Sequence, residues 1–299
     1  MTWRETVAEI LRQHASTEAD RLGTGDEAEV YALGPERVIR FYKKRVDRDL
    51  AKRRRDFYAT LDRARVAFSV PLILDEAERD GVYYTMEQRI AGVSLAEALP
   101  GLAGAARHRA LRGYAETSLA VRRLRFPQER FGEVLAPSPI LCETWQDFVL
   151  SRASKCLEAQ YRSVAVQVDR PDRALRQLET LLAQCPCPRP ELVHGDFYPA
   201  NVMIGPDGHV TGLIDFGTLT VMGDPRMDAA GAVLYISEMN GVSAEDKRIV
   251  LDCVEEHGVD ETVVALYRIF YAFRFLATDQ EVVLRWCVET LRWACGQAS

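Results

Sequence analysis

The chain lacks any long uncharged apolar segment. None of its apolar runs approaches the roughly 20 residues that a helix needs to span a bilayer. Arg4, Glu5 and Glu9 interrupt the region where a secretory signal peptide would carry its apolar stretch. We therefore expect no membrane-spanning segment and no secretory leader.

Paired cysteines are missing as well. The seven Cys are scattered and odd in number, without the C-x-x-C spacing of a zinc or redox site. Cys185-Pro186-Cys187 stands alone, and we interpret it as a loop. This usage argues against a disulfide framework and is typical of a reducing compartment. A cytoplasmic location is the expectation.

Positive charge is outnumbered. The chain has 38 Lys and Arg against 44 Asp and Glu, a net charge of −6, which disfavours a nucleic-acid-binding protein. One basic segment, residues 46–64, is predicted as a helix; RNA binding is its alternative interpretation, and a solvated helix face is the one we favour. The 299 residues, 47% of them hydrophobic, allow a substantial core in one or two domains.

Polar side chains of the kind used in catalytic sites are concentrated in residues 194–217, which read HGDFYPANVMIGPDGHVTGLIDFG. His194, Asp196 and Asn201 follow the spacing H-x-D-x-x-x-x-N, and Asp215 begins the triplet D-F-G. Two short apolar segments between Asn201 and Asp215, joined by a Pro-Asp-Gly turn, predict a β-hairpin. That hairpin would bring Asp196, Asn201 and Asp215 to one end of the structure.

Phosphoryl transfer from a nucleotide needs these groups. One carboxylate orients the attacking hydroxyl and accepts its proton, while an amide and a second carboxylate hold Mg²⁺ across the phosphates. Either half of the pattern alone would fit an ordinary hairpin with turn-capping Asp residues. Both halves, in order and joined by a turn, match the kinase catalytic loop and its D-F-G metal site. We predict a kinase-type site.

Upstream segments predict where the nucleotide binds. Gly23 and Gly25 lie between two predicted strands, the place of a loop whose backbone N–H groups cover the phosphates. The strand at 38–42 puts Arg40 where a phosphate-binding cation is expected, and strand alternation puts Lys43 on the opposite face. We favour Arg40 over Lys43, because a guanidinium stays charged and binds phosphate bidentately.

Acidic residues near these positions lead to two further expectations. Asp56, on the basic helix, is predicted to pair with Arg40. In this pair the longer Arg would replace the expected Lys, and the shorter Asp would replace the expected Glu. Asp26 and Glu27 are poor neighbours for phosphate, so their side chains are expected to point outward.

A second predicted hairpin ends in the expected hinge. There the backbone at Met86, Glu87 and Arg89 would meet the base of the nucleotide, an assignment that rests on the order of the elements. The same boundary divides the chain into an N-lobe, residues 1–88, and a C-lobe, residues 89–299.

The C-lobe is predicted to be mostly helical. One helix, at 143–162, carries Trp145, Phe148, Val149 and Arg152 along one face. We interpret this stripe as buried packing; its alternative is a wall beside a ligand. Further helices are predicted near 104–123, 171–185, 226–238, 243–256, 260–277 and 279–295.

The motifs together resemble the aminoglycoside phosphotransferase family, the branch of the protein-kinase-like fold that also contains choline and homoserine kinases. HGDFYPAN…LIDFG and the following GDPRMDAA carry the resemblance, which runs from Gly23 to at least Asp228. It implies an α+β, bilobal fold with a small antiparallel-sheet N-lobe and a larger, mostly helical C-lobe.

The resemblance also implies roles for individual residues. Asp196 looks like the general base or hydroxyl-positioning residue, and Asn201 and Asp215 look like Mg²⁺ ligands. His194 would brace the catalytic loop. Asp228 would bind the backbone of that loop from below, although from the residues alone it could equally be an ordinary first-turn acid of its helix.

The implied activity is transfer of the γ-phosphate of ATP or GTP to a hydroxyl of a small molecule. Few residues separate Gly217 from the helix after Pro225, which leaves no room for a protein-docking activation segment, and Tyr198 stands where protein kinases usually carry Lys. An aminoglycoside-like antibiotic is the favoured acceptor. The alternatives are a choline-like or homoserine-like metabolite and a non-catalytic, nucleotide-binding member of the fold.

Several acids of the C-lobe bear on the acceptor. These acids are Glu238, Glu245, Asp246, Glu255 and Glu256. They could offer carboxylates to a polycationic antibiotic, or they could be solvated surface charges. We favour the second interpretation. The expected partner is thus a small hydroxylated molecule, with no membrane and no nucleic acid.

Overall fold

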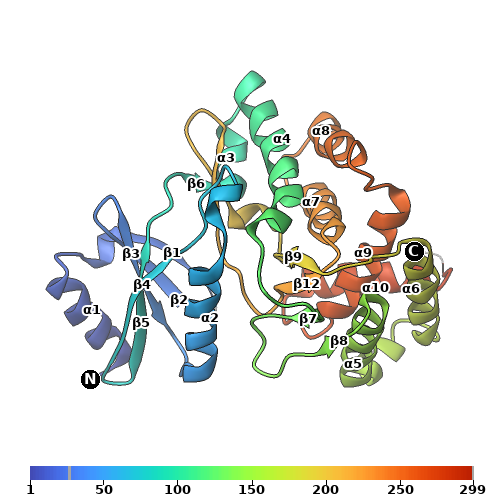
Figure 1. Ribbon diagram of the computed structural model, residues 1–299, viewed down its shortest axis with the longest axis horizontal. Helices are drawn as coiled ribbons and strands as arrows, with labels where there is room; N and C mark the ends of the chain where they lie inside the picture. Colours follow the sequence, from blue (N-terminus) through green and yellow to red (C-terminus); the bar gives the residue numbers. More distant parts are fainter. Residues whose placement is uncertain (26–27, 298–299) are drawn as a thin grey trace.

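The computed structural model describes residues 1–25 and 28–297 and has two lobes of α+β architecture (Figure 1). The expectation for Asp26 and Glu27 lies outside the described residues. Within the described part of the chain, no helix combines the length and the apolarity needed to cross a membrane.

The smaller lobe is built on a five-stranded antiparallel sheet with the order β1-β2-β3-β5-β4. Its strands are β1 (Arg21–Thr24), β2 (Ala28–Leu33), β3 (Arg37–Tyr42), β4 (Ile73–Arg79) and β5 (Val82–Gln88). Period-2 alternation sends Ile39 and Phe41 of β3 into the lobe's own core and leaves Arg40 on the other face. This alternation is what delivers a cation to the space between the lobes.

Helix α1 (Trp3–Gln13) covers the apolar face of that sheet. Thr2 and Glu5 form a capping box, which satisfies two backbone N–H groups at the start of the helix. Val7, Ile10 and Leu11 are buried against the strands.

Helix α2 (Arg48–Thr60) lies on the opposite side of the sheet, toward the larger lobe (Figure 1). Asp47 caps its N-terminus by accepting hydrogen bonds from two backbone N–H groups. Phe57 and Tyr58 pack on Phe216 of the D-F-G triplet, with ring centroids 5.5 and 6.2 Å apart. The helix therefore supports the predicted metal-binding segment directly.

The basic residues of α2 are used inside the protein. Arg53 donates to the carbonyl of Ala136 in the larger lobe at 2.5 Å, and Arg54 donates to the hydroxyl of Tyr42 at 3.0 Å. Arg55 pairs with Glu76 on β4 at 2.8 Å. Packing and lobe-to-lobe contact thus account for much of the positive charge that had RNA binding as its alternative interpretation.

The larger lobe combines helices with two small antiparallel sheets, ordered β11-β10-β6 and β8-β7-β12-β9. Its helices are α3 (Leu95–Ala98), α4 (Gly104–Ala120), α5 (Trp145–Ala165), α6 (Asp172–Gln184), α7 (Arg226–Glu238), α8 (Ala244–Glu255), α9 (Glu261–Arg274) and α10 (Glu281–Ala294). Its strands are β6 (Val93–Ser94), β7 (Phe131–Glu133), β8 (Leu141–Cys142), β9 (Glu191–Val193), β10 (Val202–Ile204), β11 (Val210–Leu213) and β12 (Val221–Gly223).

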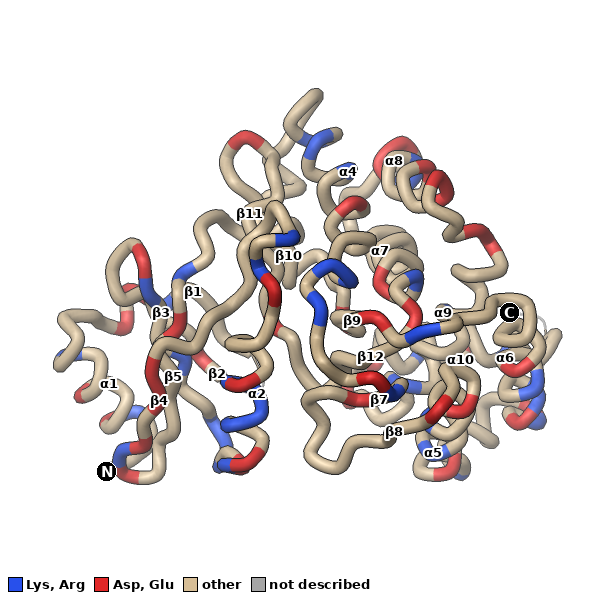
Figure 2. The backbone as a smooth tube through the Cα atoms, viewed as in Figure 1, with Lys and Arg blue, Asp and Glu red and all other residues tan. Residues whose placement is uncertain are grey.

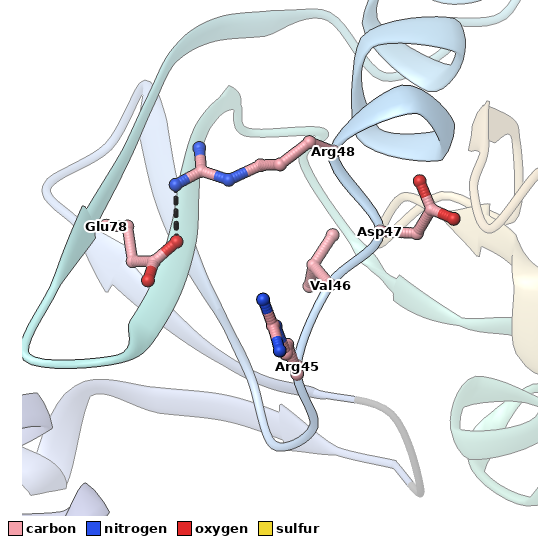
Figure 3. A pocket seen from close by; sticks show the side chains of 5 residues that line it. All are labelled: Arg45, Val46, Asp47, Arg48 and Glu78. Carbon is pink, nitrogen blue, oxygen red and sulfur yellow. Dashed lines mark hydrogen bonds and ion pairs between the residues drawn. The ribbon is translucent and has the colours of Figure 1, made fainter.

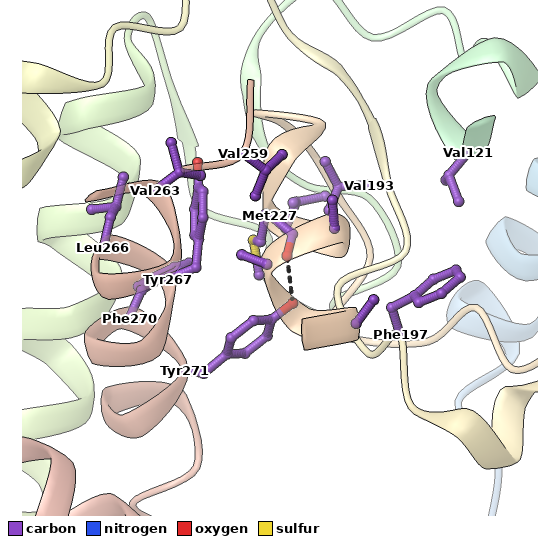
Figure 4. Close-up of a cluster of buried hydrophobic side chains, with 14 of the residues drawn as sticks. Val121, Val193, Phe197, Met227, Val259, Val263, Leu266, Tyr267, Phe270 and Tyr271 are labelled. Carbon is purple, nitrogen blue, oxygen red and sulfur yellow. Dashed lines mark hydrogen bonds between the residues drawn. The ribbon is translucent and has the colours of Figure 1, made fainter. Parts of the chain in front are cut away.

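Helix α9 is the centre of the larger core. Every residue from Ile269 to Arg274 is buried, so α9 is covered on all sides rather than on one stripe. Figure 4 shows its side chains meeting those of α7, with the Tyr271 hydroxyl donating to the carbonyl of Met227 at 3.3 Å. Phe197 lies in the same cluster, so the core supports the segment that contains Asp196 (Figure 4).

Candidate functional site

The catalytic loop lies between β9 and β10 and is held from beneath by Asp228. The two carboxylate oxygens of this fully buried residue accept the backbone N–H groups of His194 at 2.7 Å and Gly195 at 2.9 Å. Gly195 has φ +81°, and a Cβ there would lie 2.0 Å from the carbonyl oxygen of Leu219. Only glycine fits this turn, which sets the direction of the next residue, Asp196.

His194 connects the loop to the D-F-G strand. Its Nδ1 accepts the backbone N–H of Asp196 at 3.2 Å, so its Nε2 is the nitrogen that donates to the carbonyl of Ile214 at 2.9 Å. Burial lowers the pKa of His194, and the imidazole is therefore neutral. The ring also packs on Phe216, with centroids 4.5 Å apart. This bracing position is the one implied by the resemblance.

The hairpin of β10 and β11 brings the three predicted groups together. Asn201 donates from Nδ2 to the carbonyl of Asp196 at 2.9 Å, and its own carbonyl accepts the N–H of Ile214, next to Asp215, at 2.9 Å. Asp215 adopts φ +66°, a left-handed conformation that is uncommon outside glycine. These contacts place the two acids and the amide at one end of the hairpin, as predicted.

The donor set suits a magnesium ion. Because Nδ2 of Asn201 is used as a donor, its Oδ1 remains as an acceptor atom, and the backbone of Asn201 holds Ile214, the residue before Asp215. Mg²⁺ prefers hard oxygen ligands and usually takes one or two from the protein, with the rest from phosphates and water. Among the described residues, no group of three or more His, Cys, Asp or Glu is arranged to hold a metal by itself.

The two acids differ in acidity. Burial raises the pKa of Asp196, and the nearby negative charge of Asp215 adds to this. At Asp215 desolvation acts in the same direction, but the charge and hydrogen bond of Arg40 outweigh it and hold the pKa below its usual range. Asp196 is thus the better proton acceptor, and Asp215 stays ionised as a cation ligand needs.

Arg40 reaches the site, and its anchor is Glu87. Its Nη1 lies 3.0 Å from Oδ1 of Asp215, and its Nε lies 3.3 Å from Oε1 of Glu87. Glu87 is 5% exposed and also accepts the hydroxyl of Thr85 at 2.7 Å. Burial alone would lower the pKa of Arg40, but the charges of Glu87 and Asp215 raise it.

The predicted pair of Arg40 with Asp56 does not form. Asp56 lies on the exposed face of α2, where it pairs with Lys52 at 2.6 Å, while the residue that α2 turns toward β3 is Arg54. The acid instead comes from β5, where Thr85 pairs with Arg40 across the sheet and Glu87 shares the face of Thr85. Strand alternation in residues 82–88 is the signal that could have found it.

Lys43 has a different partner from Arg40. Its Nζ donates to the hydroxyl of Thr24 at 3.0 Å and to the carbonyl of Gly25 at 2.7 Å, so it holds the glycine loop rather than the D-F-G carboxylate. Among the described residues, none would come within 4 Å of a Cβ at Gly23 or Gly25, so on that side of these glycines the described part of the chain leaves space.

One backbone group of the expected hinge is engaged within the smaller lobe, and the contact of Met86, Glu87 and Arg89 with a base stays a prediction. The backbone N–H of Arg89 donates to the carbonyl of Glu36 at 2.8 Å, and its side chain donates to Gly34 at 3.0 Å. This N–H is therefore not available to a base. Met86 points into the core of the smaller lobe, and Glu87 contributes its side chain to Arg40.

A pocket of about 590 Å³ lies elsewhere, at the start of α2 (Figure 3). Arg45, Val46, Asp47, Arg48 and Glu78 line it, and Figure 3 shows Arg48 bonded to Glu78 across it. None of the predicted site residues belongs to it, and its two cations and two acids balance in charge.

Two lobes, a braced H-x-D-x-x-x-x-N loop and a D-F-G acid paired with a strand arginine define a kinase-like phosphotransferase. Residues 18–264 match the family model described as the phosphotransferase enzyme family. The match spans most of the chain, and the protein belongs to this family.

Solved structures with the same fold are aminoglycoside phosphotransferases. A ternary complex of APH(4)-Ia with AMP-PNP and hygromycin B has a TM-score of 0.68 at 20% identity, over 97% of this chain and 95% of that one. The streptomycin-ATP complex of APH(2")-IIa has a TM-score of 0.65 at 17% identity, over 98% of this chain and 97% of that one. The GDP complex of aminoglycoside 2'-phosphotransferase-IIIa has a TM-score of 0.67 at 19% identity, over 99% of both chains. No curated protein sequence matches this chain.

Asp228 should make the free energy of unfolding fall as the pH rises. Burial raises its pKa from 3.8 to about 7, although its two N–H donors oppose this. Between about pH 4 and about pH 7 the folded protein keeps a proton that the unfolded chain has released, so this stabilisation is lost as pH rises through the folded pKa. Relative to Asp228→Asn, the stability of the wild type should decrease by up to about 1.4 kcal/mol per pH unit in that window.

Urea unfolding of both proteins at a series of pH values measures this difference. Glu245→Gln, which replaces an exposed acid of α8, is the control and should follow the wild type. A difference between wild type and Asp228→Asn that does not change between pH 4 and pH 7 would contradict the prediction.

Proposed function

We propose that the protein transfers the γ-phosphate of a nucleoside triphosphate to a hydroxyl group of a small molecule. The observation that carries the proposal is the convergence of Asp196, Asn201, Asp215 and Arg40 at the end of one hairpin. These are one proton acceptor, two oxygen ligands and one phosphate-binding cation, which is the set that phosphoryl transfer requires.

The proposed reaction is direct transfer. The acceptor hydroxyl oxygen forms a bond to the γ-phosphorus, the bond from that phosphorus to the β–γ bridging oxygen breaks, and the nucleoside diphosphate leaves with that oxygen. The hydroxyl proton passes to the carboxylate of Asp196. Arg40, held by Glu87, orients the phosphates, and His194 with Asp228 keeps the catalytic loop in place, so positioning supplies much of the rate enhancement.

Asn201 and Asp215 are the proposed ligands of Mg²⁺. When bound, the ion would neutralise charge on the phosphate oxygens. We place the nucleotide between residues 1–88 and 89–299, because Arg40 comes from one of these segments and Asp215 from the other. The composition of the chain supports a cytoplasmic location.

The acceptor is proposed from the resemblance alone. The neighbouring structures contain hygromycin B or streptomycin, with AMP-PNP, ATP or GDP as nucleotides. These support a small hydroxylated acceptor and a donor that is ATP or GTP. An antibiotic, and with it a role in antibiotic resistance, is one candidate class, and a hydroxylated metabolite is the other.

The test is incubation of the purified protein with Mg²⁺ and γ-labelled ATP or GTP. The acceptors are separate pools of aminoglycosides, other antibiotics, amino alcohols, sugars and hydroxy acids. Label transferred to one pool supports the proposal and identifies the acceptor class. Binding of nucleotide without transfer to any pool would favour the non-catalytic alternative.

A further inference from the structure

Positive charge is buried beside the catalytic loop. Arg274, the last residue of α9, is 8% exposed, and its Nη1 lies 3.5 Å from the carbonyl oxygen of Leu219. This is the carbonyl that packs against Gly195, directly before Asp196. Within the described residues, Nε and Nη2 of Arg274 have no hydrogen-bond partner. A buried guanidinium with unused donors is costly unless an acceptor reaches it.

A second arginine lies in the same place. Arg152 of α5 belongs to the stripe whose aromatic members are buried, and its Nε lies 3.3 Å from Oε1 of Glu133. In the part of the chain that the structure describes, neither of these two atoms has a hydrogen-bond partner. Glu133 uses its other oxygen to accept the N–H of Ile140 at 3.0 Å. Arg152 is the arginine within ion-pair distance of Glu133, and the charges of both residues act on the buried Arg274. Two arginines with one glutamate carry one positive charge in excess.

Access to the group comes from Arg152, whose side chain is 34% exposed, whereas that of Glu133 is 1% exposed. A third unused donor is the buried hydroxyl of Tyr235 on α7, which has no partner among the described residues. Its ring meets the edge of Tyr198, 5.4 Å away between centroids, and Tyr198 is 41% exposed. The side of the loop that an acceptor would approach thus offers donors and aromatic surface.

Other arginines of this chain show what a structural role looks like. The guanidinium of Arg226 donates to both oxygens of Asp224 and to two backbone carbonyls. That of Arg107 holds both oxygens of Asp246 and three backbone carbonyls. Arg274 is more deeply buried than either, and among the described residues it has one long hydrogen bond, to a carbonyl, so packing alone does not account for it.

The acids that could have attracted a polycation are placed elsewhere. Asp246 is used by Arg107, and the other acids of α8 lie at the outer rim of the larger lobe (Figure 2). Glu133, the acid paired with Arg152, is buried. Asp246 and Glu133 are thus already neutralised by arginines, which makes neither a free carboxylate for a polycationic acceptor.

We propose that Arg274 and Arg152 bind an anionic oxygen group, a carboxylate or a phosphate, on the acceptor whose hydroxyl reaches Asp196. The inference rests on the proposed function and names its acceptor class: a hydroxylated anion rather than a polycationic antibiotic. The anion would take up the unused guanidinium donors in charge-assisted hydrogen bonds and hold the hydroxyl end of the molecule toward the base.

The experiment measures binding of matched probes to the MgADP-loaded protein at constant ionic strength, by thermal shift and calorimetry. The pairs are gluconate against glucitol and glucose 6-phosphate against glucose; hygromycin B and streptomycin are the polycations. We expect a saturable rise in Tm with one or both anions and none with their neutral partners. A response to gluconate alone assigns the site to carboxylates, and one to glucose 6-phosphate alone assigns it to phosphates.

Three variants test the residues. Arg152→Gln, at a partly exposed position, should weaken anion binding about 10- to 100-fold, the effect of losing a charge-assisted hydrogen bond. Arg274→Met should abolish it. Lys155→Gln removes an exposed cation one turn along α5 and should leave binding unchanged.

Three results would overturn the inference: no saturable shift with either anion, equal anion affinity in wild type and Arg152→Gln, or tighter binding of a polycation. Transfer of phosphate to a polycation would do the same while leaving the proposed function intact. Failure of the wild type to bind MgADP at all would instead count against the proposed function.

Discussion

Asp196→Asn should lose phosphoryl transfer and keep nucleotide binding. Asn has nearly the shape of Asp but cannot accept the proton of the acceptor hydroxyl, so the rate should fall by roughly 10²- to 10⁴-fold in kcat. Most supporting contacts survive, because His194 and Asn201 bind the backbone of residue 196, and the contact of Asn201 with the carboxylate is a long one of 3.5 Å. The measurements are kcat with labelled nucleotide and the affinity for MgADP by calorimetry.

The pH profile gives the same prediction a second readout. Because burial raises the pKa of Asp196, the base should become protonated, and kcat/KM should fall, at a higher pH than for an ordinary Asp. Asp207→Asn, which changes an exposed acid in the turn of the same hairpin, is the matched control and should keep full activity. If Asp196→Asn kept wild-type kcat, the base would have to be another group.

Local patterns predicted the parts of the fold that short stretches of chain determine. The hairpin that joins Asn201 to Asp215 depends on residues close in sequence, and it forms. The catalytic loop is similar, since His194, Asp196 and Asn201 lie within one turn and the following strand.

The errors concern partners that are distant in sequence. Asp56 does lie on the predicted helix, but on the face that points away from Arg40. The rotation of α2 about its axis is set by the packing of Phe57 and Tyr58 on Phe216, a residue distant in sequence. The hydrogen bond from the N–H of Arg89 to the carbonyl of Glu36 likewise joins segments far apart in sequence, and the order of the elements did not predict it.

The arginine cluster could not have been predicted either. Arg152, Glu133 and Arg274 come from α5, β7 and α9, and only the packing of these elements brings them to one place. No spacing within a single segment carries that information, whereas the pattern of residues 194–217 carries the whole catalytic loop.

Arg40→Ala should weaken MgADP binding about 10- to 100-fold, and Glu87→Gln should weaken it less but through the same interaction. Arg40 is the proposed phosphate-binding cation on β3, and its guanidinium contacts Glu87 through Nε and Asp215 through Nη1. Loss of a charge-assisted contact gives the first effect. The effect of Glu87→Gln is smaller because Gln keeps the hydrogen bond to Thr85 and loses only the charge. The two changes should not add, and a coupling of roughly 0.5–3 kcal/mol is expected from residues in direct contact.

The double-mutant cycle distinguishes this arrangement from its two competitors. Asp56→Asn should leave nucleotide affinity unchanged, alone and combined with Arg40→Ala, because its partner is Lys52 on the exposed face of α2. Lys43→Ala should loosen the glycine loop and remain additive with Glu87→Gln, because Lys43 contacts Thr24 and Gly25. Coupling of Arg40 to Asp56 in place of Glu87 would mean that α2 rotates when nucleotide binds. If the Arg40→Ala variant bound MgADP normally and the Lys43→Ala variant did not bind it, the phosphates would be held from the opposite face of β3.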